Sequence, residues 1–376
     1  MVGYLGYENV ELIEDVLSLK RQSELCTPDA VFAVYDTIIA FDHFKHQLIL
    51  ITNVFTNGEE DLELEFKQAK KRLSQLRKEL SVPLKQTTSF VHSTQEMQPN
   101  DESEFLQNVR QCKEHITNGD VFQIVLSQRF AATFRGDLFS VYRALRIINP
   151  SPYMYFMEFD DKVTVIGTSP EDLLKVKNRV ATILPIAGTR PRGQTGDEDA
   201  KLADELRADV KENAEHIMLV DLARNDLGRV CEFKTVKVTE NKEIRRYSHV
   251  MHLVSRVQGI LRKDTDCIDA LMAAFPAGTL TGAPKIRAIQ LIDGFEKCAR
   301  NIYGGAVGYI DFSGNLDMCI AIRTLFAKNS DLYWQAGAGI VADSDPVKEL
   351  EEIKNKSAVM RIALNYAEEI DEDPGY

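Results

Sequence analysis

The sequence lacks most of the short motifs that assign a protein to a class directly. It contains no Cys-x-x-Cys pair, no Gly-x-Ser-x-Gly and no His-Glu-x-x-His, which argues against zinc-binding modules, α/β-type serine hydrolases and zinc peptidases. It also has no Walker loop, so a nucleotide site of that kind is not expected. No apolar run approaches the roughly 20 residues of a membrane span, and the first residues do not resemble a signal peptide. We therefore expect no membrane partner.

Basic residues are outnumbered by acidic ones. The chain has 45 basic and 57 acidic residues, which gives a net charge of -12. This balance argues against nucleic acid or an anionic membrane as the main partner. The six cysteines are dispersed along the chain, as expected for reduced thiols in a cytoplasmic protein. With 376 residues, 44% of them hydrophobic, the chain can bury a large core.

Predicted strands and helices do not alternate regularly, which favours an α+β fold over a doubly wound parallel sheet. Residues 31–55 read as two strands around a polar turn, and residues 59–80 read as an amphipathic helix. The polar segment 93–103 is the best candidate for a linker. We therefore expect two parts, residues 1–95 and residues 100–370.

Two helices are predicted in the second part. A single acidic helix is expected from about residue 197 to 222, with Leu206, Val210 and Ile217 at helical spacing. Asp345-Pro346 has the pattern of a helix start, an N-cap followed by proline in the first turn. In the helix that follows, the positions expected to face the core are Val347, Leu350 and Ile353.

Two Glu-x-x-Glu pairs lie on these predicted helices, Glu212 with Glu215 and Glu349 with Glu352. Residues i and i+3 of a helix point only roughly 60° apart. Each pair taken alone fits a solvated helix face. If the two faces meet, four carboxylates converge, and such a cluster requires protons or a cation. Carboxylate oxygens suit Mg²⁺, which often bridges to an anionic substrate.

Other segments offer groups that could hold an anion. Residues 304–310 and 335–341 read as glycine-rich turns whose backbone N–H groups could bind phosphate or carboxylate, or simply as hairpins with bulges. Arg323, in a predicted apolar strand, suits a carboxylate or a structural ion pair. His252 also lies in an apolar run, where a core role and a catalytic role both remain open. Residues 185–193 form a basic segment that is either an anion-binding turn or an ordinary loop.

Taken together, ten ordered segments resemble the chorismate-utilising enzymes, most closely the large subunit (component I) of anthranilate synthases. Among them are PIAGTRPRG, ENAEHIMLVDLARNDLGRV, GTLTGAPK, YGGAVGYI, QAGAGIV and ELEEIKNK. They run in family order from about residue 100 to the end. The resemblance implies an α+β chorismate-binding fold, in which large antiparallel sheets pack together with flanking helices.

The resemblance also implies roles for individual residues. Glu215 and Glu352 match the direct ligands of Mg²⁺, and Glu212 and Glu349 match positions that act at one remove. Three residues match catalytic positions, with Glu171 as the acid for the departing C4 hydroxyl: Glu171, His252 and Thr279. Eight match positions that hold chorismate or line its site: Gln123, Gly188, Thr189, Tyr303, Arg323, Gly337, Ala338 and Gly339.

Two positions help to choose within the family. Isochorismate and salicylate synthases carry a lysine base where this chain has Gln123, and aminodeoxychorismate synthases typically carry a nucleophilic lysine where it has Ala187. Both differences favour ammonia as nucleophile and anthranilate, with pyruvate, as product. Aminodeoxychorismate synthase component I remains the nearest enzyme alternative.

The chain also departs from the family pattern. Family members usually begin with about a hundred further residues, including half of a tryptophan feedback site. The other half matches Pro152, Tyr153 and Met154. We therefore expect weak or absent feedback inhibition, and an inactive truncated subunit is a second alternative. No cysteine lies in the turn typical of a glutamine amidotransferase, so glutamine use would require a separate small subunit (component II).

Overall fold

The computed structural model describes residues 1–20, 23–58, 61–83, 88–93, 102–159, 163–247 and 250–370. By internal contacts these residues form two compact units, a small one of residues 1–2 and 32–88 and a large one of residues 3–31 and 89–376. Residues 3–31 therefore belong with the large unit, whereas the expected first part extended to residue 95. Most of the expected linker lies outside the described residues.

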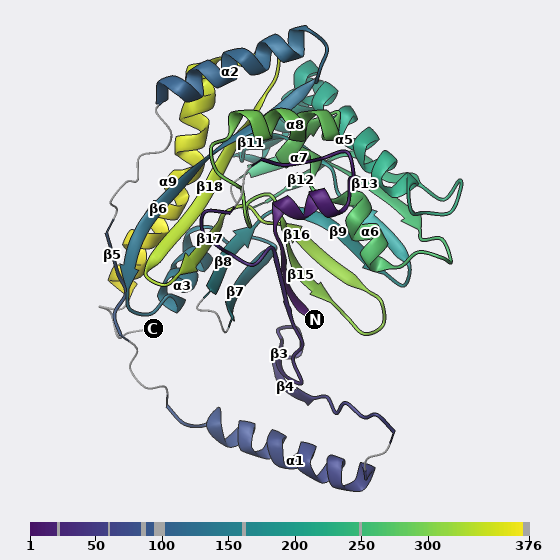
Figure 1. Cartoon of the computed structure of the whole chain (residues 1–376), viewed down its shortest axis with the longest axis vertical. Coiled ribbons are helices and arrows are strands. Elements are labelled where there is room, and N and C mark those ends of the chain that lie inside the picture. Colours follow the sequence, from purple (N-terminus) through teal and green to yellow (C-terminus); the bar gives the residue numbers. More distant parts are fainter. Residues whose placement is uncertain are drawn as a thin grey trace. The chain divides into compact units, whose positions relative to one another are not determined.

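A nine-stranded sheet forms one layer of the large unit (Figure 1). Its order is β11-β13-β10-β9-β16-β15-β1-β2, and β12 pairs with the other edge of β13. The strands are β1 (Val2–Leu5), β2 (Ala30–Ala33), β9 (Asp172–Lys177), β10 (Val180–Ile183), β11 (Ile186–Pro191), β12 (Lys237–Arg246), β13 (Val250–Ile260), β15 (Ala306–Ile310) and β16 (Leu316–Ile320).

A seven-stranded sheet forms the second layer, in the order β14-β6-β18-β17-β8-β7, with β5 also paired to β6. The strands are β5 (Val91–Ser93), β6 (Gln123–Arg135), β7 (Tyr153–Phe159), β8 (Val163–Ser169), β14 (Gly282–Ala283), β17 (Thr324–Lys328) and β18 (Asp331–Ile340). β6 and β18 pair antiparallel over ten residues without a register shift. Their side chains therefore alternate regularly between the two faces of the sheet.

Helices complete the large unit: η1 (Tyr7–Leu12), α2 (Glu102–Thr117), α3 (Phe139–Ile148), α4 (Gly196–Ala208), α5 (Val210–Gly228), α6 (Cys267–Ala274), α7 (Gly278–Thr281), α8 (Lys285–Phe295) and α9 (Pro346–Ile370). Side chains from β1, β15 and β16 pack against others from β7, β8 and β17, which joins the inner faces of the two sheets. Helices α2, α8 and α9 cover the outer face of β6 and β18. The two sheets are therefore packed together with helices outside them.

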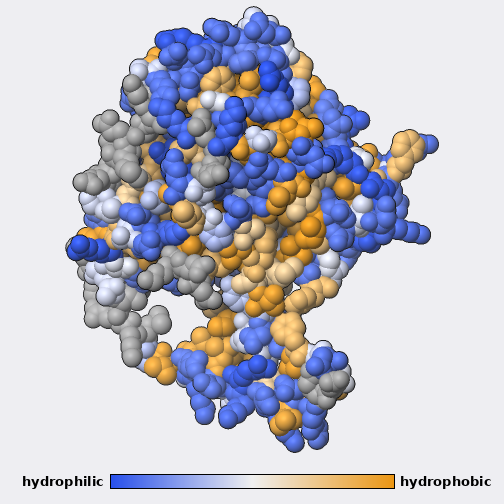
Figure 2. Space-filling view, in the orientation of Figure 1, coloured by the Kyte–Doolittle hydropathy of each residue, from blue (hydrophilic) through white to orange (hydrophobic). Residues whose placement is uncertain are grey.

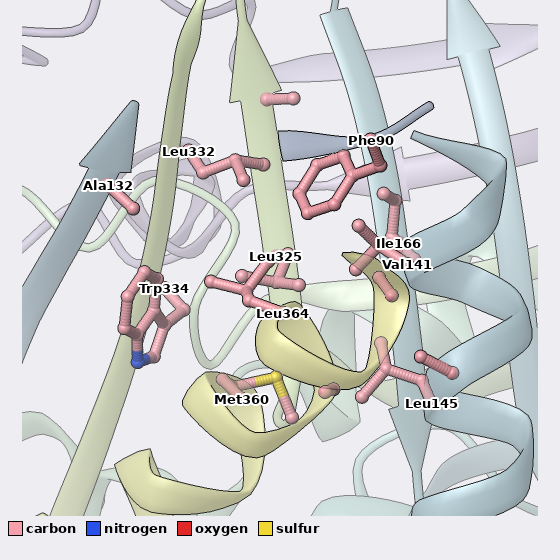
Figure 3. Close-up of a cluster of buried hydrophobic side chains, with 14 residues drawn as sticks. Phe90, Ala132, Val141, Leu145, Ile166, Leu325, Leu332, Trp334, Met360 and Leu364 are labelled. Carbon is pink, nitrogen blue, oxygen red and sulfur yellow. The ribbon is translucent and has the colours of Figure 1, made fainter. Parts of the chain in front are cut away.

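One hydrophobic core lies between the seven-stranded sheet and helices α3 and α9 (Figure 3). Leu364 and Met360 of α9 point into this core beside Leu325 and Ile166. Trp334 closes one side and donates its indole N–H to the Ser357 hydroxyl, at 2.9 Å. Because α9 is anchored here, the first turns of the same helix hold Glu349 and Glu352 in a fixed place.

The small unit consists of a hairpin, β3 (Thr37–Asp42) and β4 (Gln47–Thr52), and helix α1 (Leu62–Glu79). Asp61 caps α1 by accepting from the backbone N–H groups of Glu63 and Leu64. Apolar side chains of the hairpin and of α1 are exposed, Phe41 and Phe66 among them. Hydrophobic residues accordingly appear between hydrophilic ones on the face of the protein drawn in Figure 2.

Several local predictions hold. Helix α9 begins as expected, because Asp345 accepts from the backbone N–H groups of Val347 and Lys348. Leu350 and Ile353 are buried, but Val347 is 55% exposed, so its predicted core position is wrong. No helix in the described ranges is both long and apolar enough to cross a membrane.

The single acidic helix predicted for residues 197–222 is wrong. It divides into α4 and α5 at Asp209, whose extended backbone interrupts the helix and whose side chain caps α5 by accepting from Glu212 N at 3.0 Å. Leu206 is buried as expected, whereas Val210 and Ile217 are exposed. The break re-orients the second helix, so one continuous 3.6-residue period cannot describe both.

Candidate active site

One group of predicted residues gathers where β11 meets β13. Thr189 lies opposite His252, and the register shifts between Ala187 and Thr189, which makes a bulge at Gly188. The segment predicted as a turn is therefore a bulged strand. Gly188 has a φ of +66°, and a Cβ there would lie 2.7 Å from a methyl group of Leu206. Both the left-handed backbone and the close helix require glycine at this position.

His252 is oriented by contacts with the neighbouring strand β11. Its Nδ1 lies 3.0 Å from the Gly188 carbonyl oxygen and 3.1 Å from the Thr189 hydroxyl. A carbonyl oxygen only accepts, so Nδ1 carries the proton of the neutral ring and Nε2 is left as an acceptor. Burial lowers the pKa of His252, which favours this neutral form. The ring can therefore accept a hydrogen bond near neutral pH.

Glu171 and Thr279 form a second group. Glu171 lies between β8 and β9, and the Thr279 hydroxyl of α7 donates to its Oε2 at 3.3 Å. Burial raises the pKa of the Glu171 carboxyl, while Lys356, the Thr279 hydroxyl and Arg323 act against this rise. A carboxyl with a raised pKa retains a proton into a higher pH range and can act as a general acid. The two residues line a cavity of about 50 Å³.

Arg323 lies in the bend between β16 and β17, so its predicted position within a strand is wrong. Its φ is +48°, and its guanidinium donates to the side-chain oxygen of Asn149 at 3.0 Å. Its charge acts on both Glu171 and His252. The Glu171 group and the His252 group therefore lie in one region around the Arg323 guanidinium. This guanidinium is exposed and can bind an anion.

The four predicted glutamates come from α5 and α9. Burial raises the pKa of Glu215, the charges of Glu212 and Glu352 raise it further, and a hydrogen bond from Gln123 opposes the rise. The pKa of Glu349 is raised by burial and by Glu352. Carboxylates from the two helices therefore repel one another, as the sequence pattern suggested.

The donor set fits a divalent cation, because a cation between the carboxylates would relieve their repulsion. In the described part of the chain, however, no group of three or more His, Cys, Asp or Glu side chains is already arranged to hold a metal. Glu352 instead pairs with Lys356 at 2.6 Å, and Glu212 lies 3.5 Å from Arg190. The magnesium site thus stays a prediction, with Glu215 and Glu352 as ligands.

The central part of β18 forms a wall of the site. Gly337, Ala338 and Gly339 pair with Ser127, Leu126 and Val125 of β6, so the turn predicted for them is wrong. Ala338 belongs to the outer core with the helices, and alternation places both glycines on the opposite face. A Cβ on Gly337 would lie 2.6 Å from the Tyr303 hydroxyl, which shows how closely that phenol approaches.

The other edge of this glycine segment is available to a ligand. In the described ranges β17 pairs with β18 only from Asp331 to Trp334, so backbone groups beyond Trp334 have no strand partner on that side. Gln123 lies beside Gly339, and its buried Oε1 has no hydrogen-bond partner among the described residues. A buried amide oxygen without a partner has unused accepting capacity.

Lys356 is a site residue that the sequence reasoning missed. Its ammonium donates to the Gly337 carbonyl at 2.9 Å, pairs with Glu352 and acts on Glu171. The signal was present, because a lysine four residues after Glu352 shares its helix face. Arg323, Glu352 and Lys356 line a hollow of about 390 Å³ at the surface.

The partial feedback site lies at and just before the start of β7, where Tyr153 pairs with Ser169, two residues before Glu171. The Tyr153 hydroxyl donates to Asp317 Oδ1 at 2.7 Å, and Met154 is partly exposed. With Pro152, these residues precede or begin the edge strand of the seven-stranded sheet. Their role in feedback stays a prediction.

Comparison with known proteins places this arrangement in one class. Residues 1–361 match the chorismate binding enzyme family, and the chain belongs to that family. It is 44% identical over 377 residues to anthranilate synthase component 1 of Acetivibrio thermocellus, covering 98% of this chain and 76% of that protein. The identity to the Geobacillus stearothermophilus protein of the same name is 45% over 381 residues, covering 98% and 75%.

A solved structure agrees with these sequence relatives. The anthranilate synthase component I of Streptococcus pneumoniae TIGR4 superimposes with a TM-score of 0.84 at 40% identity, covering 96% of this chain and 79% of that one. The predicted α+β chorismate-binding fold, with packed antiparallel sheets and flanking helices, is therefore confirmed. The sequence resemblance to component I of anthranilate synthases is confirmed as well.

Proposed function

We propose that this chain converts chorismate and ammonia to anthranilate, pyruvate and water in a magnesium-dependent reaction. The observation that carries the proposal is the pairing of Glu171, a carboxyl with a raised pKa, with Thr279 beside Arg323. The relatives at 44 to 45% identity bear the name of this enzyme component. The reaction requires a proton donor and groups that hold two substrate carboxylates, and the site contains both kinds of residue.

The residues have distinct tasks in this proposal. Arg323 and the free backbone edge of Gly337 to Gly339 bind the enolpyruvyl carboxylate. Glu215 and Glu352, supported by Glu212 and Glu349, hold Mg²⁺, and the cation supplies charge compensation for the ring carboxylate. Thr189, His252 and Tyr303 orient the ring.

The first chemical step replaces one group on the ring. The ammonia nitrogen forms a bond to C2 as the double bond shifts and the C4–O bond breaks, and Glu171 gives its proton to the departing hydroxyl as water. Thr279 holds the Glu171 carboxyl in place for this transfer. Gln123 presents its unpaired Oε1 as an acceptor for an N–H group of the incoming ammonia. In the second step C2 loses its proton, the enolpyruvyl C–O bond breaks, and the released enolpyruvate takes up one proton to become pyruvate as the ring becomes aromatic.

Two neutral residues favour this reaction over its alternatives. Ala187 offers no amine that could attack the ring, and Gln123 offers no base that could activate water. Ammonia would come from glutamine through a separate amidotransferase subunit, and we place the reaction in the cytoplasm because the chain combines dispersed cysteines with a biosynthetic class of relatives.

The test is an assay with chorismate, ammonium and Mg²⁺ that follows both products. Anthranilate fluorescence and pyruvate should appear in equal amounts. Aminodeoxychorismate without pyruvate would contradict the proposal, and so would isochorismate formed without ammonium. Omitting ammonium and omitting Mg²⁺ are the two controls, and each should abolish anthranilate formation.

A further inference from the structure

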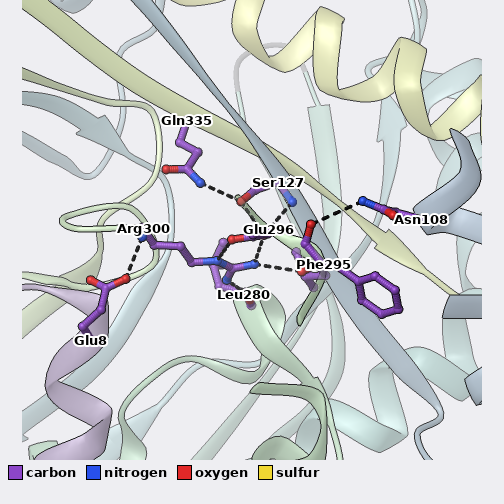
Figure 4. A network of polar contacts seen from close by, with 9 residues as sticks. Glu8, Asn108, Ser127, Leu280, Phe295, Glu296, Arg300 and Gln335 are labelled. Carbon is purple, nitrogen blue, oxygen red and sulfur yellow. Dashed lines mark hydrogen bonds and ion pairs between the residues drawn. The ribbon is translucent and has the colours of Figure 1, made fainter. Parts of the chain in front are cut away.

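A buried arginine lies within a network of polar contacts that includes Ser127 of β6 and Gln335 of β18 (Figure 4). Arg300 is 3% exposed and forms a two-pronged ion pair with Glu296, in which Nε and Nη2 donate to the two carboxylate oxygens at 2.8 and 2.6 Å. Such a fork fixes the plane of the guanidinium as well as its position. Glu296 is itself 6% exposed, so both members of the pair are buried.

The remaining guanidinium N–H groups reach two elements that carry site residues. Nη1 donates to the Leu280 carbonyl at 2.6 Å, and Leu280 follows Thr279 in α7. Nη2 donates to the Val125 carbonyl at 2.8 Å, two residues beyond Gln123 in β6. These contacts span 20 and 175 residues of sequence, so one side chain joins segments that the chain itself does not hold together.

The guanidinium also packs against aromatic rings. Its Cζ lies 4.7 Å from the ring centre of Tyr7 and 5.6 Å from that of Tyr303. Backbone contacts add to this, because Tyr303 N donates to the Arg300 carbonyl at 3.0 Å and Arg300 N donates to Glu8. The far end of the Tyr303 ring approaches Gly337. Arg300 thus supports the ring from behind.

Glu296 extends the same network to the glycine strand. It accepts from the backbone N–H and the hydroxyl of Ser127, at 2.8 and 2.7 Å, and Ser127 lies opposite Gly337 in the sheet. Gln335 also donates to the Ser127 hydroxyl, at 2.8 Å. The ion pair therefore contacts the surroundings of Thr279, Tyr303 and Gly337 together.

We propose that Arg300, paired with Glu296, is a positioning residue for the reaction, fixing α7, the Tyr303 ring and the β6–β18 wall relative to one another without contacting substrate. This inference rests on the proposed function for its assay. A buried ion pair is a costly way to stabilise a fold, because its desolvation offsets much of its attraction. Its value here is geometric, since four hydrogen bonds from β6 and α7 converge on the two side chains, in addition to the two that join them to each other.

The decisive variant is Arg300→Lys. Lysine keeps the positive charge, so Glu296 is not left unpaired, but it cannot form the fork and reach both carbonyls. We expect kcat to fall at least tenfold while the protein still unfolds cooperatively. The matched control is Arg179→Lys, because Arg179 also donates from its guanidinium to backbone carbonyls, those of Leu261 and Thr265, but joins no element of the site.

The pH profile separates positioning from stability. If α7 is released, the Thr279 hydrogen bond to Glu171 weakens, and this bond lowers the pKa of Glu171. The alkaline limb of kcat should then move to higher pH in Arg300→Lys and stay in place in Arg179→Lys. The other charges that face Glu171 are those of Lys356, Arg323 and Asp172, and none of them is changed in either variant.

Glu296→Asp provides a second variant in case Arg300→Lys does not fold, because it keeps a negative charge beside Arg300. It retains acceptors for Ser127 and weakens the fork, so kcat should fall at least threefold with a displacement of the alkaline limb in the same direction. The inference is overturned if the folded variants keep the wild-type kcat and pH profile, or if they lose only thermal stability as Arg179→Lys does.

Failure of the proposed function is distinguishable from failure of this inference. The first would appear as a wild-type protein that forms no anthranilate. In that event, calorimetric titration of chorismate in the presence of Mg²⁺ replaces the assay. Weaker binding by at least threefold in Arg300→Lys, with unchanged binding in Arg179→Lys, supports the positioning role, and equal binding in all three proteins overturns it.

Discussion

Nε2 of His216 and the hydroxyl oxygen of Ser255 lie 2.6 Å apart, and this hydrogen bond fastens the helix of Glu212 and Glu215 to the strand of His252. Ser255 also accepts from the backbone N–H of Lys242, at 2.9 Å. The imidazole is fully buried, and its Nδ1 has no hydrogen-bond partner among the described residues. Protonation would therefore place an uncompensated charge beneath the carboxylate-bearing helix.

This contact predicts a pH-dependent loss of stability. Burial lowers the pKa of His216 to about 4 from a usual 6.5. The unfolded chain therefore binds more protons than the folded one between these values, so the stabilisation is complete above pH 6.5 and is lost as the pH falls toward 4. The shift corresponds to an effect on the order of 3 kcal/mol.

The measurement is the apparent melting temperature between pH 4 and pH 7.5. His216→Gln should show a smaller decrease over this range than the wild type, because it removes the titrating ring. His43→Gln, a change in an exposed turn, is the control and should follow the wild type. Equal slopes for His216→Gln and the wild type would contradict the assignment.

A second prediction concerns the proton donor. Glu171→Gln cannot protonate the departing hydroxyl, so kcat should fall about 10²- to 10⁴-fold with a smaller change in KM. Since the acid form is the active one, wild-type activity should be lost as the pH rises through the raised pKa of Glu171. Steady-state kinetics of anthranilate formation test both statements.

Thr279→Val tests the role of Glu171 by removing its hydrogen-bond donor. The variant removes the hydrogen bond at 3.3 Å that lowers the pKa of Glu171, so the alkaline limb should move to higher pH. Thr239→Val, on the exposed edge of β12, should leave the profile unchanged. An unmoved limb in Thr279→Val would show that another group controls it.

A third prediction concerns the helix that carries Glu349 and Glu352. Leu364→Ala opens a cavity in the core beside Leu325 and should lower the free energy of unfolding by about 2 to 5 kcal/mol. Ile362→Ala, two residues earlier on the same helix and 53% exposed, is the matched control and should change it by roughly 0.5 kcal/mol or less. Denaturant unfolding measures both, and equal effects would contradict the described packing.

Local sequence rules predicted part of this fold correctly. The N-cap at Asp345 and the buried positions Leu350 and Ile353 follow from chemistry within a few residues. The sequence did not predict the break at Asp209. An aspartate within a helical pattern is compatible with a helix interior and with an N-cap, and only the structure shows that its side chain caps α5.

Contacts between distant segments were beyond the reach of such rules. Glu171 and Thr279 are 108 residues apart in sequence, and only the family resemblance put both in one site. The partners of Arg300 lie as far away as Glu8, 292 residues earlier in the sequence, and no periodicity marks a residue that is buried by such a network. The turn predicted at Gly337 and Gly339 is wrong because glycine composition does not reveal pairing with a distant strand.

The last predictions concern the metal. Glu215→Gln and Glu352→Gln should each raise the Mg²⁺ concentration for half-maximal activity at least tenfold, because each removes one charged ligand. A smaller rise in melting temperature on adding Mg²⁺ gives a readout that does not depend on turnover. Glu205→Gln, an exposed change on α4, is the control. A variant whose Mg²⁺ dependence equals that of the wild type excludes its glutamate as a ligand.

Replacing Lys356 tests the same metal site through an expected increase in Mg²⁺ affinity. Its ammonium pairs with Glu352 at 2.6 Å, so a cation bound by Glu352 must compete with it. Lys356→Met should therefore bind Mg²⁺ at least threefold more tightly in the absence of chorismate, as measured by the Mg²⁺-dependent melting temperature. Lys354→Met is a matched control, because Lys354 lies on the same helix and pairs instead with Glu102.

The same variant should also change the pH profile. Among the groups that lower the pKa of Glu171, the charge of Lys356 has the largest effect, so its removal should move the alkaline limb of kcat to higher pH. Lys354→Met should leave that limb in place. If Lys356→Met and Lys354→Met bind Mg²⁺ equally, Glu352 does not coordinate the cation, and the ligand set must be sought around Glu215 alone. If only the pH limb moves, Lys356 acts on the proton donor and not on the metal.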